Sequence, residues 1–339
     1  MSGGERMVAD MSAQPEVLAR LAARRADLHA DVARLGAPRG IVIVARGSSD
    51  YAAIFGRYLL EAATGMPVAL AAPSLETLYG VRPRVEGWLA VGVSQSGRTP
   101  EIATVLEGYK RGGASTIAVT NDAVSPLAQG ADVAVSLEAG EEGAVPATKT
   151  MTGQVAAMAL IAEALGPVPF SDSDWERLPE TVGSVLADAA PGARAAAALG
   201  DADELICVAR GYLMCVALEA ALKLREATGI RAEGWSAADF RHGPVTVARG
   251  DLPLLAVSTA GPAAEDVAEL AERLESAGTQ VLRLSDAAGA DLPFPAGLAE
   301  PLAAIPAIVR AQQLALELAR RRGVDPDEPP GLAKVTATE

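Results

Sequence analysis

Apolar runs that stop abruptly at small polar residues recur along the chain, and they predict buried parallel strands. The run at residues 88–93 stops at Ser94-Gln95-Ser96-Gly97-Arg98-Thr99, and apolar, helix-compatible sequence resumes at Ile102. This order is typical of a buried strand, a tight turn and the first turn of a helix. Similar runs predict further strands at residues 40–44, 68–72, 116–120 and 133–137.

Between these runs, apolar residues at helical spacing predict helices. The pattern predicts helices at residues 16–35, 51–64 and 217–228, whereas residues 1–12 are expected to be a loose tail. Strands that alternate with helices indicate an α/β fold with a parallel sheet and right-handed crossovers.

A sequence repeat predicts two copies of one α/β module. Three landmarks return 164 residues later, and each lies at the end of a predicted strand: Val44-Ala-Arg-Gly47 as Val208-Ala-Arg-Gly211, Val93-Ser-x-x-Gly97 as Val257-Ser-x-x-Gly261, and Asp122-Ala123 as Asp286-Ala287. We place the domains at residues 13–175 and 176–322, with a C-terminal tail at 323–339. By composition alone this tail is expected to be solvated.

Hydroxyl side chains at two strand ends of the first copy indicate a phosphate site. The turn after the strand at 88–93 carries Ser94, Ser96 and Thr99, and the turn after the first strand carries Ser48 and Ser49. Turns at the carboxyl edge of an open parallel sheet bind ligands, and free N–H groups at a helix start favour anions. The alternative is that Ser96 and Thr99 only cap a helix. Neither a P-loop nor Gly-x-Gly-x-x-Gly occurs, so a nucleotide is not favoured.

Composition and charge exclude several classes of function. The 339 residues suit about two domains, and the net charge of −14 argues against a general binder of nucleic acid or anionic membranes. The two cysteines, Cys207 and Cys215, lie in apolar sequence, which favours free thiols and a cytoplasmic protein. With only His29 and His242 besides them, we expect no metal site and no cofactor. The N-terminus lacks the apolar core of a signal peptide, and no charge-free run has the length of a membrane span.

Three further residue groups could carry chemistry. Lys223 and Glu226 share a helix face, so they form either a proton-transfer pair or a surface ion pair. His242, in a predicted turn, is either a proton carrier or a structural histidine. Lys334 lies in a stretch less polar than a free tail should be, and a lysine amine can form a Schiff base with a carbonyl.

Together these pieces resemble the SIS (sugar isomerase) family, in particular the isomerase half of glucosamine-6-phosphate synthase and the SIS-type glucosamine-6-phosphate deaminases. The resemblance extends from about Gln14 to Glu339 and rests on six motifs: Gly47-Ser48-Ser49, Ser94-Gln95-Ser96-Gly97-x-Thr99, Val145-Pro-Ala-Thr-Lys149, the run from Ala217 to Glu226, Arg241-His-Gly-Pro244 and Leu332-Ala-Lys334. It implies two modules, each a five-stranded parallel α-β-α sandwich, with a C-terminal tail over the site.

The resemblance also assigns roles to residues. It implies that the sugar phosphate is held by Ser49, Ser94, Gln95, Ser96 and Thr99, with Ser48 adjoining, and that the backbone at Val145 and Ala333 touches the sugar. It implies that Glu226 moves a proton between C1 and C2 with help from Lys223. His242 would open the sugar ring, reaching it from the other subunit of a homodimer, and Lys334 would form a Schiff base with a ketose.

Two departures from the family pattern bear on the substrate, and a third bears on the reaction. Arg98 and Ala147 replace an acidic residue and a serine that are usual in the synthases, and the synthase's glutaminase domain does not occur in these residues. We therefore expect an amino-sugar phosphate deaminase/isomerase that yields fructose 6-phosphate and ammonia, or uses free ammonia in reverse. The alternatives are a deglycase for fructosamine-type phosphates and a non-catalytic sugar-phosphate sensor.

Overall fold

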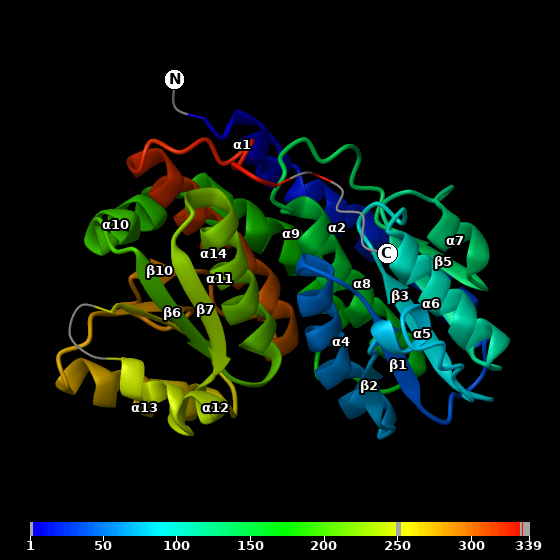
Figure 1. Ribbon diagram of the computed structural model, residues 1–339. Helices are drawn as coiled ribbons and strands as arrows, with labels where there is room; N and C mark the ends of the chain where they lie inside the picture. Colours follow the sequence, from blue (N-terminus) through cyan, green and yellow to red (C-terminus); the bar gives the residue numbers. More distant parts are fainter. Residues whose placement is uncertain (1–2, 249–251, 333, 335–339) are drawn as a thin grey trace. The chain divides into compact units, whose positions relative to one another are not determined.

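The computed structural model describes residues 3–248, 252–332 and 334, which group into two compact units (Figure 1). The first-sheet unit comprises the described residues of 16–141, 149–169 and 334. The second-sheet unit comprises those of 3–15, 142–148 and 170–332. Because each unit is assembled from separate segments, the domain limits expected from sequence differ from these groupings and stay a prediction.

The first-sheet unit is built on a five-stranded parallel sheet of order β2-β1-β3-β4-β5. Its strands are β1 (Ile41–Val44), β2 (Val68–Leu70), β3 (Leu89–Val93), β4 (Ser115–Thr120) and β5 (Val133–Ser136). Its helices are α2 (Gln14–Ala23, from its third residue on), α3 (Arg25–Ala33), α4 (Ser48–Thr64), α5 (Ser74–Thr77), α6 (Pro100–Arg111), α7 (Pro126–Gly130) and α8 (Lys149–Leu165).

The second-sheet unit repeats this topology, since its parallel sheet has the order β7-β6-β8-β9-β10 read from the other edge. Its strands are β6 (Glu204–Ala209), β7 (Arg231–Ser236), β8 (Leu254–Val257), β9 (Val281–Ser285) and β10 (Leu292–Pro293). Its helices are α1 (Glu5–Ser12), α9 (Asp172–Ala187), α10 (Ala190–Leu199), α11 (Met214–Thr228), α12 (Ala237–Arg241), α13 (Ala264–Ser276) and α14 (Glu300–Arg321), with 3-10 turns η1 (Gly211–Leu213) and η2 (Pro244–Val247). The predicted fold class and repeat are therefore confirmed.

The central strands of both sheets are buried on their two faces, which explains their uninterrupted apolar runs. All residues of β1, β3 and β8 are buried. In the second-sheet unit, α11 packs against β7 and α14. Gly234 of β7 allows this close approach, because a Cβ there would lie 2.7 Å from the Cα of Leu218 in α11.

Two expectations about local structure are wrong. Residues 1–12 are not simply a loose tail: Glu5–Ser12 form α1, whose Met7 and Met11 are buried against Ala144 and Leu316. The helix expected at 16–35 is two helices, α2 and α3, separated at Arg24, whose φ of −95° and ψ of 7° interrupt the helical path.

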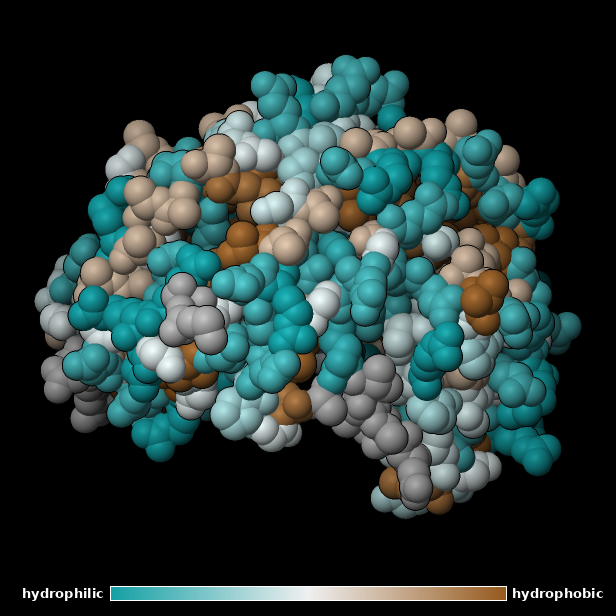
Figure 2. Space-filling model, turned by 90° about the horizontal axis from the view of Figure 1, so that it is seen from above, coloured by the Kyte–Doolittle hydropathy of each residue, from teal (hydrophilic) through white to brown (hydrophobic). Residues whose placement is uncertain are grey.

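The polarity of the surface and the burial of the longest described helix, α14, both concern association with a membrane. The face drawn in Figure 2 is mostly hydrophilic, and its hydrophobic residues form small separate patches. Among the described residues, α14 is the one helix with the length and hydropathy of a membrane span, but 94% of its apolar window is buried inside the protein. It is therefore a core helix of the second-sheet unit.

Candidate active site

The two hydroxyl-rich turns of the first-sheet unit follow β1 and β3, which are neighbours in the sheet. The Ser94 hydroxyl is buried, lies 3.4 Å from the Thr99 hydroxyl and accepts a hydrogen bond from the Gly97 N–H at 3.2 Å. Ser49, also buried, accepts a hydrogen bond from Gln154 of α8 at 2.9 Å. Half-buried Ser48, Gln95, Ser96 and Thr99 complete the two turns at the surface.

Thr99 occupies the position before α6, yet its side chain makes no capping hydrogen bond. Its hydroxyl meets that of Ser94 instead, whereas the Ser96 hydroxyl accepts the N–H of Arg98 at 3.2 Å. Helix capping therefore does not account for Thr99, and the arrangement leaves hydroxyls gathered at the carboxyl edge of the sheet.

Gly97 is required for the shape of this turn. Its φ is +62°, and a Cβ there would lie 2.1 Å from the Ser125 hydroxyl and 2.7 Å from that of Thr120. A side chain at this position would displace the turn that carries Ser94 and Ser96.

Arg98, the departure from the family pattern, points to an acidic partner within the same unit. Its guanidinium lies 2.8 Å from the carboxylate of Asp122, one of the landmarks of the repeat. The hydrogen bond from Arg98 is the largest cause of the lowered pKa of Asp122. With its side chain 63% exposed, Arg98 stands at the surface of the turn.

In the second copy, the corresponding turns are occupied by the chain's own carboxylates. Asp286 accepts hydrogen bonds from the Thr259 hydroxyl at 2.7 Å and from the Ala260 N–H at 3.1 Å. Glu300 lies against both strand ends: its carboxylate would come within 2.4 Å of a Cβ at Gly261 and 3.6 Å of one at Gly211. The small crevice lined by Arg210, Ser258, Thr259 and Glu300, among others, has no volume for a water molecule.

This occupation predicts that Glu300 excludes external anions from the second crevice. Burial already raises the pKa of the Glu300 carboxyl. Replacing Glu300 with alanine removes this carboxylate and should create a second, weak site for inorganic phosphate. Titration followed by ³¹P NMR would measure the number of sites. Glu265→Ala, which removes an exposed carboxylate of α13, is the matched control for net charge. An unchanged number of sites in Glu300→Ala would contradict the prediction.

A buried charge cluster lies in the second-sheet unit. Lys223 is fully buried, donates a hydrogen bond to Glu226 and lies 3.5 Å from the buried carboxylate of Glu219. Burial, the largest influence on Lys223, would lower its pKa, but attraction to Glu219, Glu226 and Glu142 outweighs it and raises the pKa. The surface ion-pair interpretation of Lys223 is therefore wrong, since only the Glu226 side chain, 20% exposed, reaches solvent.

The loop at residues 142–148 contributes to this cluster. The carboxylate of Glu142 is buried and accepts a hydrogen bond from the Thr148 N–H at 2.8 Å. Sequence reasoning missed Glu142 and Glu219. Glu219 could have been found from its i, i+4 spacing to Lys223, whereas nothing local to the sequence of the loop brings Glu142 to α11.

His242 lies at the opposite edge of its sheet from Glu226. Glu226 is near the C-terminus of α11, which returns the chain to the start of β7, whereas His242 follows α12 beyond the end of β7. The six residues of β7 span about 16 Å at the usual rise per residue of a strand. The structure thus does not bring exposed His242 to the Lys223–Glu226 pair within one chain.

The remaining predicted residues are placed as follows. Val145 is half-buried, and its N–H donates to the Asp327 carbonyl at 3.3 Å. Lys334 is half-buried, and Ala333 lies outside the described residues. Cys207 and Cys215 are buried free thiols, as expected, and burial raises the pKa of Cys207 to about 12.

This geometry defines a class of protein: two α/β modules, with hydroxyl-rich turns at one sheet edge and a buried lysine–glutamate pair. The family described as the SIS domain matches residues 36–164 and 198–293, and this chain belongs to that family. The resemblance inferred from the motifs is confirmed.

Relatives and solved structures agree with this assignment. The chain is 34% identical, over 88% of its length, to glutamine–fructose-6-phosphate aminotransferase (isomerizing) of Halobacterium salinarum. It spans about half the length of the curated relatives it matches, 51% in that case. A candidate phosphosugar isomerase from Silicibacter pomeroyi is 30% identical, with a TM-score of 0.83 over 95% of this chain and 99% of that one. Glucosamine-6-phosphate deaminase of Thermotoga maritima, 23% identical, shares the fold with a TM-score of 0.80 over 98% of this chain and all of that one.

Proposed function

We propose that this protein is an amino-sugar phosphate deaminase/isomerase that converts glucosamine 6-phosphate and water to fructose 6-phosphate and ammonia, or the reverse. The observation that carries the proposal is the fully buried Lys223, whose ammonium donates a hydrogen bond to the carboxylate of Glu226, a side chain that is 20% exposed. A sugar-phosphate sensor has no need of a buried proton-transfer pair. The aminotransferase and phosphosugar isomerase relatives support sugar-phosphate chemistry of this kind.

In this proposal the phosphate is bound by the first-sheet turns. Ser49, Ser94, Gln95, Ser96 and Thr99 supply donors, with Ser48 adjoining, at a helix start that favours an anion. Such local donors are needed because the net charge of −14 opposes phosphate binding. The contact of Arg98 with Asp122 leaves the guanidinium neutralised at the surface of the turn.

The chemistry is assigned to the second unit and the tail. After His242 opens the ring, Glu226 takes the C2 proton and returns it to C1, while the Lys223 ammonium stabilises the charge that develops. The Lys334 amine then replaces ammonia at C2 as a Schiff base, and water releases the ketose. Because His242 and Glu226 lie at opposite edges of one sheet, we propose that His242 acts across the interface of a homodimer.

The direct test is to incubate the purified protein with glucosamine 6-phosphate and to assay ammonia and fructose 6-phosphate. We expect stoichiometric release of both products. A panel that includes fructosamine-type phosphates, assayed with wild type and Lys334→Ala, would separate a deaminase from a deglycase. Thermal stabilisation by sugar phosphates with no turnover of any of them would overturn the proposal in favour of a sensor.

A further inference from the structure

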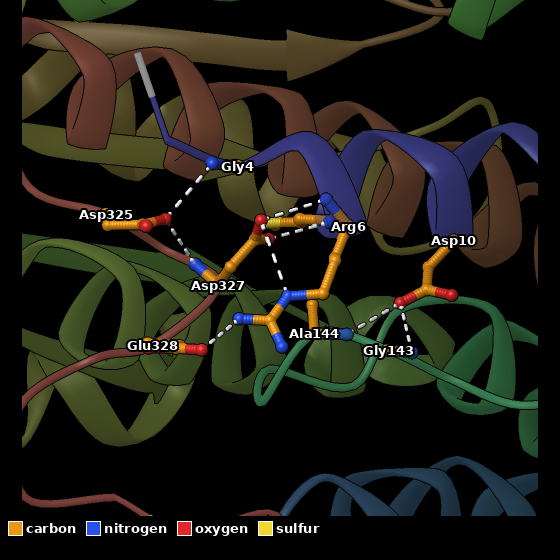
Figure 3. Close-up of polar contacts among 9 residues, drawn as sticks. Gly4, Arg6, Asp10, Gly143, Ala144, Asp325, Asp327 and Glu328 are labelled. Carbon is orange, nitrogen blue, oxygen red and sulfur yellow. Dashed lines mark hydrogen bonds and ion pairs between the residues drawn. The ribbon is translucent and has the colours of Figure 1, made fainter. Parts of the chain in front are cut away.

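Helix α1 connects two segments that lie far from it in the sequence (Figure 3). Residues 325–328, here called the tail base, meet its first turn. The carboxylate of Asp327 accepts the N–H groups of Arg6 and Met7, each at 2.8 Å, and Asp325 accepts the N–H of Gly4 at 3.1 Å. The tail base therefore satisfies N–H groups at the start of α1 that have no partner within the helix.

The other end of α1 holds the loop at residues 142–148. One carboxylate oxygen of Asp10 accepts the N–H groups of Gly143 and Ala144 at 2.8 and 2.9 Å. The next residue, Val145, donates its N–H to the carbonyl of Asp327 at 3.3 Å. Helix, loop and tail base thus form a closed network of hydrogen bonds.

The two aspartates that hold this network together are buried. Asp10 and Asp327 are each 5% exposed, and Met7 and Met11 of α1 are buried with Ala144 and Leu316. Hydrogen bonds to a charged, buried carboxylate are stronger than those between neutral groups. The pair between Arg6 and Glu328, by contrast, lies at the surface and contributes little.

We propose that Asp327 and Asp10 are positioning residues, which fix the loop bearing Val145 and the tail bearing Lys334 to the common support of α1. The same loop carries Glu142, one of the carboxylates that face Lys223, so the network also reaches the charge cluster of α11. The catalytic part of this proposal rests on the proposed function of Val145 and Lys334. The mechanical part, that the loop and the tail base are fixed to α1, does not.

Amide hydrogen exchange tests the mechanical part. Asp327→Asn keeps the side-chain shape but can accept only with its single oxygen, so exchange over residues 4–7, 143–145 and 325–332 should be about tenfold faster, which corresponds to 1.4 kcal/mol. Asp10→Asn should accelerate exchange at residues 143–145 and leave 325–332 near wild type. The control Glu328→Gln should change neither. Unchanged exchange in both Asp variants would overturn the proposal.

Kinetics test the catalytic part. We expect kcat of Asp327→Asn to fall about tenfold at a KM for sugar phosphate within about twofold of wild type, because the phosphate turns belong to another part of the chain. Borohydride trapping of a ketose phosphate on Lys334 should fall in parallel. A kcat equal to that of Glu328→Gln would overturn it. If Asp327→Asn does not fold, Asp10→Asn decides through kcat alone, which should fall because the loop bearing Val145 is loosened, while trapping on Lys334 stays near wild type. A wild type inactive on every sugar phosphate would overturn the proposed function, while the exchange results would still decide the network.

Discussion

Replacing Glu226 with glutamine should lower kcat for ammonia release by roughly 10³-fold, the size of effect expected for loss of a general base. The amide keeps the shape of the side chain and can still accept the hydrogen bond from Lys223, but it cannot take a proton from C2. KM and the melting temperature should stay close to those of wild type, because the Glu226 side chain is partly exposed and the phosphate turns are untouched. Steady-state assays of ammonia would measure the overall reaction, and exchange of substrate deuterium at C2 into solvent would measure the removal of the C2 proton.

The matched control for this variant is Arg225→Gln. Arg225 is exposed and adjacent on α11, so it reports the effect of one charge change on the same helix without touching the Lys223–Glu226 pair. Ammonia release that persists at the wild-type rate in Glu226→Gln would remove Glu226 from the mechanism.

The sequence predicted the first-sheet unit well because each strand carries its own signal. Buried parallel strands give unbroken apolar runs, and the turns at their ends carry glycine and hydroxyl residues. Val93 and Thr120 end β3 and β4 where the pattern predicted. The second copy was found by the constant offset of the strand-end landmarks, which works because both sheets share one strand order.

The features that the sequence did not predict depend on distant partners. Helix α1 is only eight residues long, and it is held by Asp327, more than 300 residues away. The burial of Lys223 is equally non-local, because spacing alone does not distinguish a solvated ion pair from a buried one that also faces Glu142 of a distant loop. The composition of residues 325–328 suggested solvation, whereas Asp327 is buried by its contacts with α1.

Replacing Lys223 with methionine should destabilise the protein by about 3–5 kcal/mol, because it leaves buried carboxylates without their counter-charge. Glu219 is 1% exposed and Glu142 faces the same ammonium, so neither can recover hydration without opening the packing around α11. Urea unfolding followed by circular dichroism would measure the loss. Lys110→Met is the matched control, since Lys110 forms an ion pair with Asp132 at 2.8 Å but its side chain is 39% exposed. This variant should lose only about 0.2–1 kcal/mol of the free energy of unfolding.

The double variant Glu219→Gln/Lys223→Met decides whether the uncompensated charge causes this loss. Removing Glu219 as well leaves one buried carboxylate fewer without a counter-charge, so the double variant should be more stable than Lys223→Met alone. A purely steric role for Lys223 predicts the opposite, because Glu219→Gln would then add its own cost to an unchanged packing defect. Since Lys223 also donates to Glu226, Lys223→Met should in addition lose turnover in the fraction that remains folded, and the double variant should recover stability without recovering activity.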